Sequence, residues 1–183
     1  MSSRKVAIKY AQTLLETSVE KNSLAVIGDD VTLALLALRQ NPKFMRLLKN
    51  PIVKLEVKQS ILNEVFQSRV SEEFFSFITF LISKGRETIL DEILECFETL
   101  KNEQLGIAKV ELTTSIEVDE HQLEKIKVTL EKLLNKSVIF SKKIDASIIG
   151  GFVAKVDDKI YDASVKNQLE LMKKQLVNGA GAI

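Results

Sequence analysis

The sequence is poor in residues that cross-link a chain or interrupt its secondary structure. Its 183 residues include one cysteine, two prolines, seven glycines and no tryptophan. A single cysteine excludes an internal disulfide and a zinc site built from several cysteines, and it fits a reducing compartment. So few prolines and glycines leave little room for long loops. These absences favour an ordinary globular protein with closely spaced helices or strands.

Charge of one sign and long apolar runs are also missing. The 26 Lys and Arg residues balance 25 Asp and Glu, so the net charge of +1 creates no overall attraction to nucleic acid or anionic lipid. All five arginines precede residue 105, and arginine is the usual contact to phosphates and base edges. No segment approaches the ~18 apolar residues of a membrane span, and the N-terminus lacks the apolar core of a signal peptide. We therefore expect a soluble protein without direct membrane insertion.

The apolar residues of positions 1–105 are spaced as in helices throughout. They predict six helices, at 4–21, 24–39, 42–48, 54–67, 72–84 and 86–103. Asn41-Pro42 and Asn50-Pro51 are expected to start the third and fourth helices, because proline fits the first helical turn. Ser71 is expected to begin the fifth helix and Gly85 to end it. The first domain is therefore predicted to be a six-helix bundle over 1–105.

After Gly106 the apolar period changes from about 3.6 residues to 2. The alternation predicts a strand at 108–116, followed by a helix at 119–135 with Leu133 among its inward residues. Strands at 138–144, 152–156 and 160–161, the last two joined by a turn at Asp157-Asp158, precede a final helix at 164–177. The predicted fold class is thus α+β: a helical bundle, then a small α/β domain over 106–183 with the order strand-helix-strands-helix.

No residue pattern indicates catalysis. His121 has no second His or Cys nearby and is expected to face solvent, and Cys96 is expected to be a small buried hydrophobe. Gly150-Gly151 lacks the spacing of a phosphate-binding loop. A cation site built from acidic residues is conceivable, but roles in turns and caps explain each of them better: Asp145, Asp157, Asp158 and Asp162. The sequence predicts no metal, no cofactor and a protein that is not an enzyme.

Two of the predicted helices are more apolar than one contact with a core requires. At about 100° per residue, apolar side chains cover roughly 220° of the helices at 4–21 and 72–84. Either both helices lie centrally among the others, or each offers a second face to a partner. In the second interpretation the two helices form a groove for an amphipathic helix. The residues predicted to line that groove are Val6, Tyr10, Leu14, Phe77 and Phe80.

Three segments carry a family resemblance. They are Lys9-Tyr10-Ala11-x-x-Leu14-Leu15 near the start; Leu81-Ile82-x-x-Gly85-Arg86, with Leu90 and Ile93, in the middle; and Asp145-x-Ser147-Ile148-Ile149-Gly150-Gly151 with Asp158-x-x-x-Asp162-x-Ser164-Val165 and Leu169 near the end. In this order they resemble the delta subunit of F-type ATP synthases, whose mitochondrial relative is the oligomycin sensitivity conferral protein. The third segment is the most specific. Asp157 departs from the family, which often has Gly there.

The resemblance implies a non-catalytic subunit of the peripheral stalk, present once in each synthase. Its six-helix domain would bind the N-terminal helix of an alpha subunit through the first and fifth helices. Its C-terminal domain would bind the C-terminal region of the b subunits. As a stator it would keep the catalytic head from turning with the rotor, so that proton-driven rotation yields ATP. It would lie peripherally on the cytoplasmic face of a bacterial inner membrane.

The family motif also needs a physical role. Asp145 opens it, Gly150 and Gly151 would permit a bend between strands, and Asp162 and Ser164 would cap the last helix. Two alternatives remain at this point. One is a helical adaptor or nucleic-acid-binding protein unrelated to ATP synthase, although basic surface and arginine are scarce. The other is an enzyme that uses the Asp cluster with a divalent ion.

Overall fold

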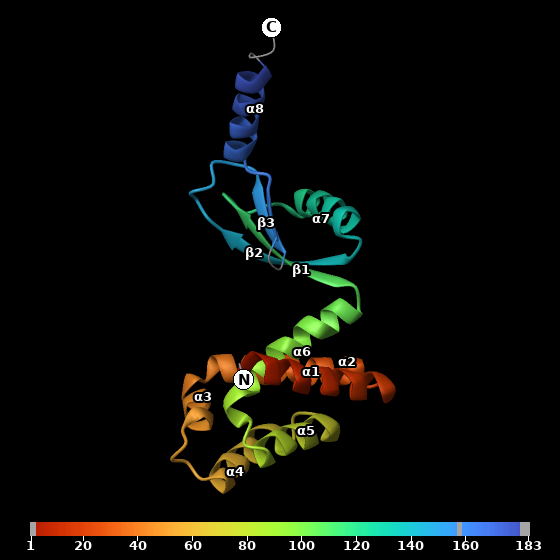
Figure 1. Cartoon of the computed structure of the whole chain (residues 1–183), viewed down its shortest axis with the longest axis vertical. Coiled ribbons are helices and arrows are strands. Elements are labelled where there is room, and N and C mark those ends of the chain that lie inside the picture. Colours follow the sequence, from red (N-terminus) through yellow and green to blue (C-terminus); the bar gives the residue numbers. More distant parts are fainter. Residues whose placement is uncertain (1–2, 157–158, 180–183) are drawn as a thin grey trace. The chain divides into compact units, whose positions relative to one another are not determined.

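The computed structural model describes residues 3–156 and 159–179, with side chains described as far as Lys174. The chain divides between Lys101 and Asn102 into two compact units. Helices dominate the first unit (Figure 1), which contains α1 (Ser3–Glu20), α2 (Leu24–Gln40), α3 (Pro42–Lys49), α4 (Leu55–Phe66), α5 (Glu72–Ser83), the 3₁₀ turn η1 (Glu87–Ile89) and most of α6 (Leu90–Gln104). The second unit contains β1 (Ile107–Thr114), α7 (Glu120–Leu134), β2 (Ser137–Ile144), β3 (Phe152–Val156), β4 (Lys159–Asp162) and α8 (Val165–Gly179). The predicted α+β class is confirmed.

Small side chains bring α1 close to the rest of the helical unit. Ala7 and Ala11 lie one turn apart, and both are fully buried. They face a core to which α2, α4, α5 and α6 contribute large side chains, including Phe66, Phe74 and Phe97, which are fully buried. Because protein interiors pack to crystal-like density, a larger residue at either alanine would push α1 outward.

One buried ion pair crosses the same core. The Lys58 Nζ of α4 lies 2.8 Å from the Glu87 Oε1 of η1, and it donates a hydrogen bond to the Leu48 carbonyl oxygen at 2.7 Å. Both charged side chains are almost completely buried. Loss of one partner in such a pair costs about 3–5 kcal/mol, since it leaves the other charge uncompensated. The pair therefore ties the end of α3 and the first turn of α4 to the segment that follows α5.

The second unit is built on a four-stranded mixed sheet with the order β2-β1-β3-β4. Strands β1 and β2 are parallel and are connected through α7, whereas β3 pairs antiparallel with both β1 and β4. Helix α7 packs on one face of the sheet (Figure 1), where Leu130 joins a small core with Val110, Leu112 and Ala154. The opposite sheet face carries Lys109, Glu111 and Lys155, and these charged side chains are suited to contact with water.

The Asn-Pro pairs act differently from the prediction. Pro42 does begin α3, but the Asn41 side-chain amide donates to the Ala37 carbonyl oxygen at 3.1 Å and so completes the end of α2. The side chain of Asn50 accepts a hydrogen bond from the Ile52 backbone at 2.9 Å, which holds residues 50–52 in a turn. The fourth helix starts at Leu55, within one residue of the predicted start at 54. Side-chain amides compete with helix hydrogen bonds, and here they close turns instead of opening helices.

Two further boundaries and one inward position differ from the predicted pattern. The sixth helix does not start at Arg86, because the chain passes through η1 before α6 begins. Strand β1 ends at Thr114, whose hydroxyl donates to the Ile116 carbonyl oxygen at 2.7 Å and leaves Ile116 exposed. Leu133 is exposed, and Leu134, four residues after Leu130, occupies the inward position instead. The predicted turn at Asp157-Asp158 lies outside the described residues.

Gly151 supplies a conformation that other residues adopt only under strain. Its φ of +78° lies in the left-handed region, and a Cβ added there would lie 2.3 Å from the Ala163 carbonyl oxygen. Neighbouring backbone hydrogen bonds run from Val165 N to the Gly150 oxygen (3.0 Å) and from Ala163 N to the Phe152 oxygen (2.9 Å). The two glycines thus let the loop before β3 lie directly against the start of α8.

We expect Gly151→Ala to destabilise the second unit by roughly 3 kcal/mol, because strain and a backbone clash add. Hydrogen exchange of the β3 and β4 amides in the full chain would measure the loss locally. Gly106→Ala is the matched control: its φ is +64°, but a Cβ there meets nothing within 4 Å. That variant should lose only about 1 kcal/mol. Equal losses in the two variants would show that the close backbone approach at Gly151 is not important.

Candidate functional site

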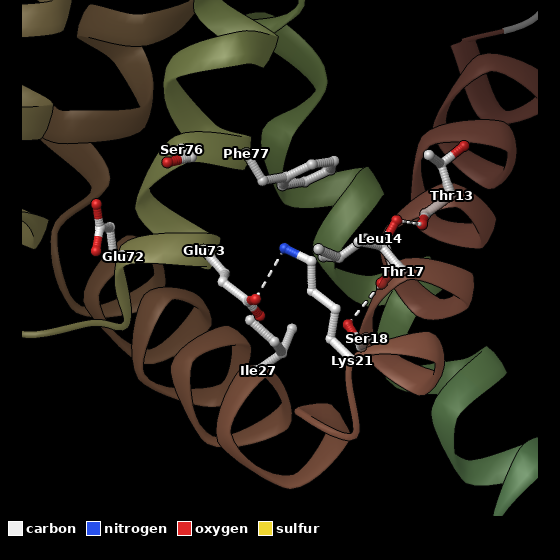
Figure 2. A pocket seen from close by; sticks show the side chains of 10 residues that line it. All are labelled: Thr13, Leu14, Thr17, Ser18, Lys21, Ile27, Glu72, Glu73, Ser76 and Phe77. Carbon is white, nitrogen blue, oxygen red and sulfur yellow. Dashed lines mark hydrogen bonds and ion pairs between the residues drawn. The ribbon is translucent and has the colours of Figure 1, made fainter.

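Helices α1 and α5 run antiparallel and enclose a groove at the surface of the helical unit. The name groove covers a pocket of about 340 Å³ and the adjoining surface around Tyr10 and Phe80 on the same two helices. In the pocket, α1 forms one wall, α5 the other, and Ile27 of α2 part of the lining (Figure 2). The residues that line the pocket are Thr13, Leu14, Thr17, Ser18, Lys21, Ile27, Glu72, Glu73, Ser76 and Phe77. A concave surface between two helices is the usual receptor for a third helix.

One half of the groove is aromatic. The rings of Tyr10 and Phe80 meet edge to face, with centroids 6.4 Å apart and planes inclined by 64°. The Lys84 Nζ lies 5.5 Å from the centroid of the Phe80 ring, within cation–π distance. Even with these neighbours, 47% of Phe80 is exposed. A large aromatic side chain left open at the surface is a ready anchor for a partner.

The structure brings together four of the five residues predicted for the groove. Leu14 and Phe77 line the pocket, and Tyr10 and Phe80 contact each other further along the same two helices. Leu14 is nearly buried and belongs mainly to the core, whereas Tyr10 and Phe77 are half-buried. Val6 is half-buried one turn before Tyr10 on α1. On each of these helices one face therefore lies in the core, while the other keeps apolar side chains partly open to solvent; a partner on that open face stays a prediction.

The other half of the groove is polar, and the apolar pattern gave no sign of it. Lys21 Nζ, just after α1, pairs with Glu73 Oε1 of α5 at 2.9 Å, as Figure 2 shows. The Ser23 hydroxyl donates to the other carboxylate oxygen of Glu73 at 2.8 Å. Hydrogen bonds from Lys21 and then from Ser23 hold the pKa of Glu73 below its usual value. The signal in the sequence is a polar ridge at intervals of four: Thr13, Thr17 and Lys21.

A buried carboxylate fixes the start of α5. Asp30 of α2 accepts a hydrogen bond from the Ser71 backbone at 3.0 Å and a second, short one from the Ser71 hydroxyl. The same hydroxyl oxygen accepts from the Phe74 backbone and caps α5, as predicted. Asp30 is largely buried, so a single side chain sets both the cap and the position of the α5 N-terminus against α2.

The family motif of the second unit forms turns and a helix cap. The side chain of Asp145 accepts a hydrogen bond from the Ser147 backbone at 2.9 Å, and Asp162 accepts one from the Ser164 backbone at the same distance. Hydrogen bonds from the two serines lower the pKa of both carboxyl groups. The Ser164 hydroxyl oxygen in turn accepts from the Asn167 backbone at 3.2 Å, at the start of α8. These contacts serve the local fold, and Asp158 lies outside the described residues.

Helix α8 carries a row of apolar side chains that no described part of the chain covers. Val165, Leu169 and Met172 follow one another at spacings of four and three, which places them on one face of the helix. All three are exposed. The sequence pattern had predicted the row itself, which also includes Leu176, but the side chain of Leu176 lies outside the described part. An exposed apolar row on a helix is typical of a surface that another helix covers.

The described residues hold no group of side chains placed to bind a metal ion. Within 3–156 and 159–174, no three His, Cys, Asp or Glu side chains lie where they could hold a metal ion together. His121 is exposed on α7, as predicted, and burial raises the pKa of the half-buried Cys96 thiol. None of the described helices has both the length and the apolar character needed to cross a membrane.

The sequence was compared with family models and with known proteins, and the matches agree with one another. The family model for the ATP synthase delta (OSCP) subunit matches residues 6–176. ATP synthase subunit delta of Flavobacterium psychrophilum is 34% identical over 178 residues, which cover 97% of this chain and all of that protein. The subunit delta of Lactobacillus johnsonii is 32% identical over 97% of both chains.

A solved structure has the same fold at lower sequence identity. It is a chain in the cryo-EM structure of the Toxoplasma gondii mitochondrial ATP synthase hexamer, with a TM-score of 0.75 and 19% identity. The match covers 93% of this chain and 97% of that chain. The family match and the relatives above span nearly the whole sequence, and they lead to one conclusion. The chain belongs to the ATP synthase delta (OSCP) subunit family.

Proposed function

We propose that this chain is a non-catalytic stator: its helical unit binds the alpha/beta catalytic head, and its second unit binds the membrane-anchored b subunits. As a member of the delta family it is a peripheral-stalk subunit of F-type ATP synthase. The observation that carries the proposal is the α1/α5 groove, which holds Phe80, the one exposed aromatic side chain among the described residues. A stator contributes to ATP synthesis and hydrogen-ion transport by holding the head still, so it requires binding surfaces and no reacting groups.

The proposed occupant of the groove is the N-terminal helix of an alpha subunit, and the helical unit corresponds to the six-helix bundle of the family. An amphipathic helix would place its apolar face on Tyr10, Phe77 and Phe80. The half-exposed Phe80 has about 100 Å² to bury, which stabilises a complex by about 2 kcal/mol. A few such anchors supply most of the energy of a typical interface.

The second unit, residues 106–183 in the predicted division, is proposed to bind the C-terminal region of the b subunits. Its exposed row of Val165, Leu169 and Met172 on α8 offers the kind of seam that packs against another helix. Small residues, caps and turns around Gly151 and Ser164 hold the start of α8 against the sheet. A mechanical load from the b subunits would therefore be transmitted from α8 directly to the sheet.

In this assignment one copy serves each synthase, on the cytoplasmic face of a bacterial inner membrane. The protein would be held there through its partners and not by insertion. No cofactor, metal or nucleic acid is needed for the role.

Native mass spectrometry tests the whole proposal. The catalytic head without its delta component, mixed with the full chain, should gain one copy and no more, because a single stalk holds the head. A second copy on saturation would contradict the stoichiometry. No complex at micromolar concentration would leave the stator role without support.

The groove can be tested with one substitution. Phe80→Asp should weaken binding of a peptide from the N-terminus of the alpha subunit by at least about thirtyfold, because about 2 kcal/mol of apolar burial is lost and a charge must be desolvated. Isothermal titration calorimetry measures the affinity, and circular dichroism checks the fold. Val57→Asp on α4 is the matched control, since Val57 is also 47% exposed but lies outside the groove.

The control should bind the peptide as the wild type does. Unchanged affinity in Phe80→Asp would show that the helix binds elsewhere. A large loss of helicity would show that Phe80 supports the core despite its exposure.

The α8 seam allows an equally direct comparison within one helix. Leu169→Asp should abolish capture of the C-terminal region of the b subunits in a pull-down while leaving binding of the alpha peptide intact. Leu171→Asp is the control: Leu171 is 50% exposed against 60% for Leu169, but it lies on a different side of the helix. If both variants, or neither, lost the b subunits, the row of Val165, Leu169 and Met172 would not be the contact.

A further inference from the structure

Charged side chains on α1 change sign along the groove. Lys9, Glu16 and Glu20 follow one another at spacings of seven and four, so they lie along one side of the helix. That side borders the groove, because residues three or four apart are neighbours on a helix surface and Thr13 and Thr17 line the pocket. Lys9 lies four residues before Thr13. Glu16 and Glu20 lie three residues after Thr13 and Thr17, respectively. All three charged residues are exposed. The edge of the groove on α1 is therefore basic near Tyr10 and acidic near the helix end.

Helix α5 repeats the same change of sign in the same spatial direction. Glu72 and Glu73 line the pocket at its start, whereas Lys84 lies over the Phe80 ring just after its end. Because the two helices are antiparallel, Lys84 falls at the end of the groove that holds Tyr10 and Lys9. Lys21 offsets the charge of Glu73 at the other end, but Glu72 and the two glutamates of α1 are left in excess. The groove thus has a basic aromatic end and an acidic polar end.

Only the side chains can produce this polarity. Each helix has a positive N-terminal and a negative C-terminal end, and in an antiparallel pair these partial charges oppose each other at both ends of the groove. The aromatic and aliphatic contacts also discriminate little between the two directions of a bound helix, since burial of apolar area is non-directional. The direction of an occupant must therefore come from charged groups at the rim.

We propose that the groove selects the direction of the helix bound in it by charge. The occupant is an amphipathic helix with acidic side chains toward one end and basic side chains toward the other. Its acidic end lies beside Lys9 and Lys84, and its basic end lies beside Glu16, Glu20 and Glu72. This inference rests on the proposed function, in which the occupant is the N-terminal helix of the alpha subunit.

The strength of this preference for one helix direction depends on how exposed the charged residues beside the groove are. Exposed ion pairs contribute little one at a time, but reversal of the helix converts each attraction into a repulsion, so several pairs add to the discrimination. Salt screens such pairs over a Debye length of about 8 Å at physiological ionic strength. Directional preference should therefore weaken as salt rises, while the apolar contacts persist.

The test uses the full chain and the N-terminal peptide of the alpha subunit from the same organism, labelled with a nitroxide at one end or the other. Paramagnetic broadening in NMR spectra reports which end of the groove each label approaches. We expect the label at the more acidic peptide end to broaden amides around Lys84, and the opposite label to broaden amides around Glu73. Exchanging the rim charges (Lys9→Glu, Lys84→Glu, Glu16→Lys and Glu20→Lys together) should reverse the pattern.

Single substitutions give a second measure that does not depend on four changes folding together. Lys84→Glu should lower the affinity of the peptide about fivefold at low salt and by much less at high salt. Lys43→Glu makes the same charge change on α3, away from the groove, and should leave the affinity unchanged.

The outcomes separate the two proposals. If the peptide fails to bind the wild-type chain, the alpha contact of the proposed function is wrong, and the direction rule falls with it. If the peptide binds in the groove with its acidic end beside Glu73, or in both directions equally, the proposed function stands and the direction rule is overturned. A salt-independent affinity in Lys84→Glu that equals the wild type would also overturn it.

Discussion

The burial of α5 is the constraint on which the helical unit depends. Phe74, Ile78, Leu81 and Ile82 place one side of this helix fully in the core. Polar contacts fix the chain on either side of it: Asp30 holds the cap before α5, and the Lys58–Glu87 ion pair holds the segment after it. A helix held along one face and at both flanks cannot rotate about its axis. Its remaining apolar residues are therefore presented outward at fixed positions, and this is what makes the groove a defined surface.

The same constraint explains why α1 borders the groove without closing it. Ala7 and Ala11 let α1 pack tightly on its inward side, while Thr13 and Thr17 on the neighbouring face bond to backbone oxygens of their own helix. Those threonines cannot seal an apolar gap, so the pocket between α1 and α5 stays open below the Tyr10–Phe80 contact. In the proposed function, stability and recognition use opposite sides of the same two helices, and neither side has to be weakened for the other.

Sequence periodicity predicted the elements because helix and strand spacing are local properties. It located the helices and strands to within a few residues and singled out α1 and α5 as too apolar for one contact. It did not find the polar end of the groove, since Ser23 and Glu73 meet across 50 residues of sequence, nor the partner of Ser71, which is 41 residues away. The same limit applies to Asn41 and Asn50. Which backbone group a short polar side chain binds depends on neighbours that a single helical pattern does not specify.

A stator must stay bound under load, and in the proposed function the two halves of the groove serve different parts of that task. Rim charges act at a distance, so they accelerate encounter and orient the incoming helix, but salt weakens them. Buried aromatic contacts act only once the helix is seated, and they mainly slow its dissociation. Lys84 belongs to both groups, because the ammonium that carries its charge at the rim also lies over the Phe80 ring. The residue that helps to set direction therefore also contacts the main aromatic anchor, so that a correctly oriented helix arrives where its apolar face can be held.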